Sequence, residues 1–183
     1  VFVGTEKVRG NHSRIVFRAG SEATALATTS VTALGQAGAT LSVAPNEVPA
    51  RVDQLLQDVK TSQATVEQWQ QHYAAALAAQ YAPGTAEAPT VVALALHADT
   101  AAALPHVGRA FAAQPHTVAL LSAPDGTHTK IVFAASPGVE LDTKAAFTAV
   151  LNEYGGRGGG RPDWLQGAVP APTEAIAAAL QRI

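Results

Sequence analysis

The sequence predicts an α/β protein with an N-terminal β-hairpin, a long helical coiled-coil stalk and a small mixed-sheet α/β domain. Three observations support this class. Two short β-type runs flank a turn near the start, apolar residues follow heptad spacing through 48–80, and strand-like and helix-like segments alternate after residue 89. Hydrophobic residues make up 48% of the 183 residues, which is enough apolar material for a folded core.

The chain is expected to begin with the β-hairpin. The runs 1–8 and 14–18 contain strand-forming residues, and Gly-Asn-His-Ser at 10–13 has the chemistry of a turn. In the second run Ile15 and Phe17 share one face, which is the alternation of a half-buried strand.

Positive charge concentrates in this hairpin. The first 20 residues carry four basic side chains and one acidic one, a net charge of +3, whereas the whole chain has a net charge of -2. Lys7, Arg9 and Arg14 are therefore candidates to contact a nucleic-acid backbone. The alternative is that these charges only keep a solvated strand edge soluble.

Residues 21–82 are expected to form a helical stalk. The first helix covers about 21–41, and Pro45-Asn46 separates it from a second helix that begins near Glu47. Apolar residues occupy eight of the ten heptad core positions of the second helix, which indicates a dimer interface. The predicted seam residues are Val52, Leu55, Val59, Val66, Trp69 and Tyr73.

Antiparallel pairing of the two helices within one chain is the alternative for the first half of this seam. At ~1.5 Å per residue the first helix spans roughly 30 Å and the second roughly 50 Å. The second half, around Trp69 and Tyr73, therefore needs another partner, either a second copy of the chain or an adjoining domain.

A Pro/Gly/Ala-rich linker at 83–89 is expected to lead into an α/β domain at 90–183. The order of strand, crossover helix, strand, hairpin and helix implies a mixed sheet with helices on its faces. The strands are expected at 90–96, 117–122 and 129–135, and the helices at 100–113, 143–152 and 173–181.

A glycine-rich run is the sharpest local motif. Five glycines, namely Gly155, Gly156, Gly158, Gly159 and Gly160, are interrupted by Arg157 and followed by Arg161. Glycines let a backbone approach an anion closely, and arginines bind phosphates, so the run predicts a phosphate or RNA-backbone contact. A flexible linker is the alternative. The run is not a Walker loop, because Arg161-Pro162 stands where Lys and Ser or Thr should be.

The chain contains no cysteine and no methionine, which excludes disulfides and cysteine-ligated metal sites. The six histidines form no H-x-x-x-H pair, so no metal ligand and no catalytic residue is assigned. No stretch reads as a membrane span or signal peptide, and we expect a soluble, cytoplasmic protein. Because the chain begins at Val1, we expect it to be part of a longer or processed protein.

Two motifs together suggest a family. The segment from Gly155 to Asp163 resembles the glycine-rich signature near the C-terminus of alanyl-tRNA synthetases and of long stand-alone alanyl-tRNA editing proteins. Residues 6–20 resemble the segment that follows the zinc centre of the editing proteins. Two departures are that Trp164-Leu165 replace the usual small residue before glutamine, and that Arg161 replaces the histidine usual in related DHH-type phosphoesterases.

The resemblance implies a region that binds tRNA(Ala) and forms a homodimer in an alanyl-tRNA editing or synthetase-related protein. Residues 1–20 would be a remnant hairpin of the editing domain, 21–82 the dimerisation stalk and 90–183 a glycine-rich DHH-associated domain. Zinc, and the deacylation of mischarged tRNA(Ala), would belong to an editing domain upstream, with no cofactor in this chain. The alternative is an accessory domain of a DHH-type phosphoesterase, or a module that binds a small phosphorylated ligand.

Overall fold

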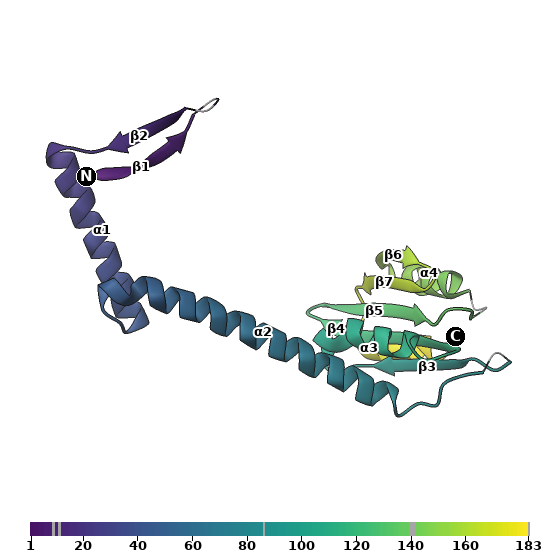
Figure 1. Cartoon of the computed structure of the whole chain (residues 1–183). Coiled ribbons are helices and arrows are strands. Elements are labelled where there is room, and N and C mark those ends of the chain that lie inside the picture. Colours follow the sequence, from purple (N-terminus) through teal and green to yellow (C-terminus); the bar gives the residue numbers. More distant parts are fainter. Residues whose placement is uncertain (9, 11, 86, 140–141, 183) are drawn as a thin grey trace. The chain divides into compact units, whose positions relative to one another are not determined.

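The computed structural model confirms the predicted α/β class (Figure 1). It describes the chain except for residues 9, 11, 86, 140–141 and 183. The chain divides into two compact units, residues 1–63 and 64–183, and each is described by itself.

The first unit begins with the expected hairpin. Strands β1 (Phe2–Lys7) and β2 (Ser13–Phe17) pair antiparallel, with a register irregularity between Phe2 and Gly4. The expectation of a half-buried second strand is wrong, because Ile15 is 67% exposed and the terminal Phe17 is 70% exposed. Within this unit no described element covers the apolar face of the hairpin.

Two helices follow, as predicted. Helix α1 (Gly20–Leu41) ends where Ser42 adopts a left-handed backbone with φ 56°, and the 3-10 turn η1 (Pro45–Glu47) leads into α2 (Val48–Ala78). Helix α1 packs mainly against η1. Val52, at 41%, and Val59, at 53%, are exposed, so the alternative of an intramolecular seam between the two helices is not formed.

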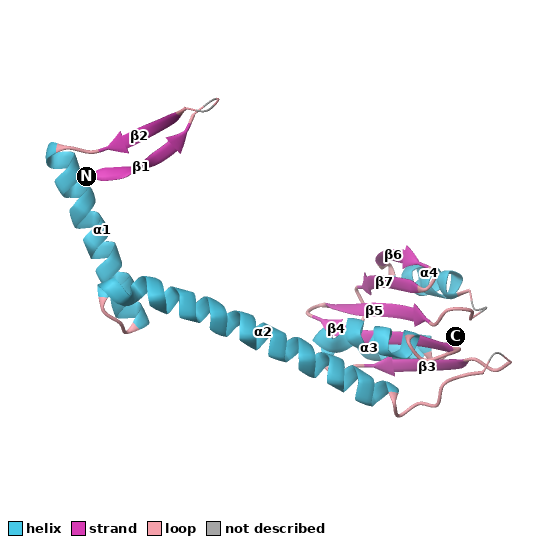
Figure 2. Cartoon of the chain, in the orientation of Figure 1, coloured by secondary structure: helices cyan, strands magenta, loops and turns pink. Residues whose placement is uncertain are grey.

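The second unit contains a five-stranded mixed sheet with the strand order β3-β4-β5-β7-β6 (Figure 2). The strands are β3 (Thr90–Ala95), β4 (Thr117–Asp125), β5 (His128–Ala135), β6 (Arg157–Arg161) and β7 (Trp164–Val169). Strands β3 and β4 are parallel and are joined by η2 (Ala101–Ala103) and α3 (Leu104–Ala112), whereas every other pair is antiparallel. A crossover helix is what a parallel pair requires.

Helices cover both faces of this sheet. Helix α3 and the last turns of α2 pack on one face, where Leu121 of β4 is buried. Helices α4 (Thr143–Tyr154) and α5 (Thr173–Leu180) pack on the other, where the adjacent Leu120 is buried. Because successive strand residues point to opposite faces, a strand between two helical layers is apolar throughout. We refer below to the first face as the α3 face.

Strands β6 and β7 are the part of the fold that the sequence did not predict. The glycine run from Arg157 to Arg161 is not a flexible linker, because it pairs antiparallel with β7 along its whole length. Glycine has low strand propensity, so this strand depends on pairing with β7 and on the helix that covers it.

Candidate nucleic-acid interface

Most glycines of the run are explained by packing. Gly155 caps α4 in a left-handed backbone with φ 68°. A methyl group on Gly158 would lie 2.5 Å from the carbonyl oxygen of Gln166 and 2.9 Å from a ring carbon of Phe147 on α4. The side chain is therefore absent at Gly158 because α4 and β7 already fill that space.

Two further glycines have the same kind of explanation. A methyl group on Gly156 would collide with the side chain of Val169. Gly160 has φ 148°, and a methyl group there would collide with the carbonyl oxygen of Trp164. Gly159 differs from Gly156, Gly158 and Gly160, because nothing lies within 4 Å of the position that a methyl group would take, and it differs from Gly155 because its φ is not positive. Only Gly159 of the run therefore has both an ordinary backbone and open space beside it.

Strand register places the two arginines and Gly159 on one face. In the antiparallel pair β6–β7, Arg157 lies opposite Ala168, Gly159 opposite Gln166, and Arg161 opposite Trp164. Directly opposed residues of such a pair share a face. Trp164 packs against the core beneath α3, so all of these residues belong to the α3 face.

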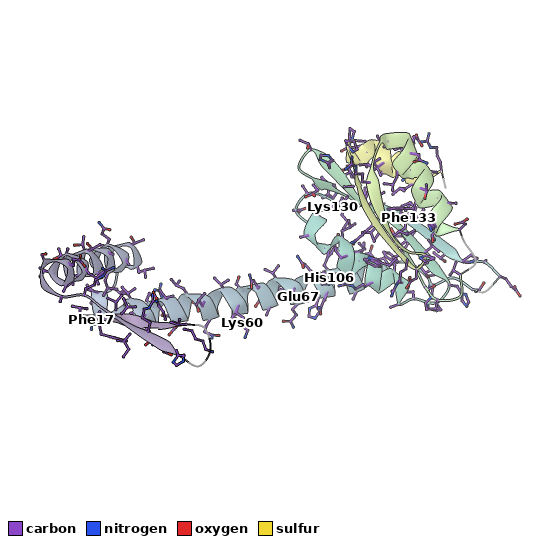
Figure 3. All side chains as sticks on the ribbon, turned by 90° about the horizontal axis from the view of Figure 1, so that it is seen from above. Phe17, Lys60, Glu67, His106, Lys130 and Phe133 are labelled. Atoms are coloured by element: carbon purple, nitrogen blue, oxygen red, sulfur yellow. The ribbon has the colours of Figure 1, made fainter. Side chains whose placement is uncertain are left out.

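Strand β5 is the third strand that contributes residues to this surface. Lys130 also lies opposite Ala168, so Lys130, Ala168 and Arg157 form one row across β5, β7 and β6. With strands ~4.8 Å apart, the backbones of Lys130 and Arg157 are about 10 Å apart. Figure 3 labels Lys130, and Phe133 three residues later points to the opposite face, where it stacks edge-on with Phe147.

A groove of about 470 Å³ lies between this row and the start of α3. Its polar lining comes from Lys130, Arg157 and Gln166. Apolar residues and glycines form the rest of the lining, among them Ala101, Leu104, Val132 and Ala168. The groove thus combines two cationic side chains and one amide with an otherwise apolar lining, which suits the approach of a phosphate backbone.

A second groove of about 520 Å³ lies on the same face towards the end of α3. Arg109, Arg161, Asp163 and Trp164 are among its lining residues. The guanidinium carbon of Arg109 lies 5.8 Å from the centre of the Trp164 ring, which is cation–π geometry. Gly108 lets the indole lie against α3, because a methyl group there would be 3.0 Å from the ring.

Four cations on this face differ in their partners. Lys130 pairs with Asp125 at 3.0 Å, and Arg161 pairs with Asp163 at 3.0 Å. In the part of the chain that the structure describes, Arg157 and Arg109 have no carboxylate within ion-pair distance. These four cations and the two carboxylates that pair with them carry a net charge of +2.

Sequence reasoning identified Arg157 and Arg161 on this face but missed Lys130, Gln166 and Arg109. Strand alternation in 128–135 was the available signal for Lys130, since it separates this lysine from the buried Ile131. No local signal marked Arg109, because its place depends on how α3 packs over Trp164.

Of the basic residues predicted to bind in the N-terminal hairpin, the two that the structure describes, Lys7 and Arg14, do not share a face. Lys7 lies opposite Ser13, whereas Arg14 lies opposite Glu6 and forms an exposed ion pair with it at 3.7 Å. Neighbouring positions of a strand point to opposite faces, so Lys7 and Arg14 project to different sides. The third predicted residue, Arg9, lies outside the described residues. The role of all three in RNA binding stays a prediction.

The predicted dimer-seam residues are mostly exposed in the single chain. Val66 is 52% exposed, Trp69 69% and Tyr73 37%, while Leu55 is half-buried. Leu56, which was not predicted, is 63% exposed beside them. Helix α2 thus carries an apolar stripe with no cover inside the units described, and pairing through it stays a prediction.

The described residues contain neither a metal-binding cluster nor a membrane-spanning helix. No group of three or more His, Asp or Glu side chains gathers there in a way that could hold a metal ion. Among the same residues, no helix combines the length and the apolar character needed to cross a membrane.

Comparison with known proteins finds a similar solved structure. The C-Ala domain of Aquifex aeolicus alanyl-tRNA synthetase is similar to this chain with a TM-score of 0.42 and 18% sequence identity, over 55% of this chain and 96% of that domain. No family model matches the sequence. No curated protein matches it either.

Proposed function

We propose that this chain is a tRNA-binding and assembly region of a protein that edits mischarged tRNA(Ala) or is related to alanyl-tRNA synthetases. One observation carries the binding part of the proposal. Arg157, Gly159 and Arg161 share the α3 face with Lys130 and Gln166, in the strand register of the sheet. The family and the tRNA ligand are proposed because two motifs of the sequence resemble those of alanyl-tRNA synthetases and alanyl-tRNA editing proteins.

The chemistry of this face suits an RNA backbone. Guanidinium groups bind phosphate oxygens with two parallel hydrogen bonds, and the Gln166 amide both donates and accepts. The open space beside Gly159 lets a sugar or phosphate approach the strand closely. Such contacts position an RNA without reading its sequence, which is the role expected of an accessory region.

The assembly part of the proposal rests on α2. A helix of 31 residues with Val59, Val66 and Trp69 more than half exposed on one heptad stripe can bury that stripe against a second copy. A homodimer would present two copies of the cationic face.

On this proposal the deacylation itself lies elsewhere in a longer protein, in a domain that holds zinc. That zinc and its reaction step belong to another domain is what the resemblance of the sequence implies. The contribution of this chain is to hold the tRNA while another domain acts on its aminoacyl end.

The test is binding of a fluorescent tRNA(Ala) transcript to the chain, measured by anisotropy over a range of salt concentrations. Arg157→Ala is expected to weaken binding and to lower the slope of log affinity against log salt by about 1. Arg182→Ala is the matched control, because Arg182 pairs with Glu153 of α4, the helix that covers the opposite face of the sheet.

Absence of measurable tRNA binding by the unchanged chain would contradict the proposal. AMP is tested in parallel, since the same groove of about 470 Å³ is the feature that favours a small phosphorylated ligand. AMP binding that depends on Arg157, without tRNA binding, would support that alternative.

A further inference from the structure

We propose, resting on the proposed function, that Arg157 and Arg109 are the two arginines that contact RNA phosphates, and that Asp163 keeps Arg161 from doing so. The glycine-rich motif places Arg157 and Arg161 symmetrically around three glycines. The structure makes them unequal, because their guanidinium groups have different neighbours.

One edge of the Arg161 guanidinium, the Nε and Nη2 pair that would bind an anion with two hydrogen bonds, is already occupied by Asp163. Its Nε donates to one carboxylate oxygen of Asp163 at 3.1 Å, and its Nη2 donates to the other at 3.0 Å. The two residues are only two positions apart in the sequence, and together they have no net charge. A phosphate that approached Arg161 would also approach the carboxylate, so the attraction and the repulsion would largely cancel.

Arg109 has the opposite arrangement. Its guanidinium lies over the Trp164 ring, and stacking on an aromatic face leaves the N–H groups at the edge of the guanidinium available. Arg109 lines the same groove as Arg161 and Asp163. None of the described carboxylates forms an ion pair with it. The second available cation of the α3 face therefore comes from helix α3 and not from the glycine motif.

Asp163 acquires a defined role from this arrangement. Its backbone carbonyl accepts a hydrogen bond from the Ala135 N–H and so joins the β6–β7 turn to β5. Its side chain neutralises Arg161. Asp163→Asn keeps the backbone contact and removes the negative charge, which frees Arg161 to contact phosphate.

The experiment measures the salt dependence of tRNA(Ala) binding for single variants of the whole chain. Arg109→Ala is expected to lower the slope by about 1, as Arg157→Ala does, because each removes one phosphate contact. Arg161→Ala is expected to leave the slope equal to that of the Arg182→Ala control. Asp163→Asn is expected to raise the slope by about 1 and to tighten binding.

Arg109→Lys separates charge from packing. A lysine keeps the positive charge, so a phosphate contact predicts a slope close to that of the unchanged chain. Thermal unfolding of each variant establishes that the fold is intact, so that a change in slope is not a loss of structure.

Two results would overturn the inference while leaving the proposed function in place. One is a slope for Arg109→Ala that equals the control, and the other is a slope for Arg161→Ala as low as that for Arg157→Ala. Failure of the unchanged chain to bind tRNA contradicts both proposals, and it is recognised before any variant is compared.

Discussion

Gly158 and Gly159 are neighbours in the same edge strand, yet an added methyl group should affect them in opposite ways. Gly158 faces α4 and Gly159 faces the α3 side. We predict that Gly158→Ala destabilises the second unit, whereas Gly159→Ala leaves it unchanged or slightly more stable. The pair is well matched, because both changes add one methyl group to the same five-residue strand.

The magnitudes follow from what each methyl group would contact. At Gly158 it would lie 2.5 Å from the Gln166 carbonyl oxygen, 2.6 Å from the Gly167 Cα and 2.9 Å from a carbon of Phe147. Two of these are backbone atoms that cannot rotate away, and overpacking of this kind costs about 1–3 kcal/mol. At Gly159 nothing lies within 4 Å, and replacing glycine in an unstrained conformation contributes about 0.4–1 kcal/mol through the unfolded chain.

Thermal unfolding followed by circular dichroism measures the difference. For a unit of this size the destabilisation at Gly158 corresponds to a melting temperature lower by about 5–15 °C. Equal melting temperatures for the two alanine variants would refute the assignment of Gly158 to packing. A larger side chain at the open position, Gly159→Leu, is expected to keep the fold and to weaken tRNA binding by blocking the α3 face. Undiminished binding would show that RNA does not approach there.

Three other predictions follow from the same structure. The double variant Val59→Asp, Val66→Asp is expected to be a monomer in sedimentation velocity, because it places two charges in the predicted dimer seam. Gln57→Asp, on the other side of α2, is the control and is expected to leave the dimer intact. A double variant that remains a dimer would contradict the seam. Phe147→Ala should cost about 3–5 kcal/mol in chemical denaturation, because this ring is 2% exposed, and a loss below about 1 kcal/mol would contradict its place in the core. Asp142→Ala should cost about 1 kcal/mol, because its carboxylate accepts the backbone N–H three residues later at 2.9 Å, and an unchanged stability would show that this cap contributes nothing.

Periodicity alone was enough to predict most of the elements. The strand predicted at 117–122 is β4, which is buried over seven consecutive residues because helices cover both faces of the sheet there. The helix predicted at 143–152 is α4, and the Asp142 carboxylate caps it by accepting the Ala145 N–H. Such features are local, because spacing and capping act within one element.

Strands β6 and β7 could not be predicted in the same way. The segment Arg157–Arg161 contains no residue with strong strand propensity, and every residue in it is exposed. It is a strand because β7 pairs with it and because α4 packs over its glycines. Both causes lie outside the segment, whereas its own residues favour a loop.

The candidate site shows the same limit at the level of side chains. Arg157 is adjacent to the glycines in sequence, and the motif pointed to it directly. Lys130 reaches the same row only through two successive registers, β5 with β7 and β7 with β6. A shift of one residue in either register would move it to the opposite face. Residues that converge through register cannot be identified before the register is known.

The strand register gives most of these glycines a structural explanation in place of a binding role. A run of glycines beside arginines suggested a surface for close approach of an anion, yet Gly156, Gly158 and Gly160 are each required by contacts with the protein's own atoms. Only at Gly159 does the absence of a side chain leave open space on the cationic face. The density of glycine in this motif is therefore mainly a consequence of close contact with β7, of packing against α4 and of positive φ at Gly155 and Gly160. Its capacity to bind RNA depends on one open position and on arginines that have no carboxylate partner.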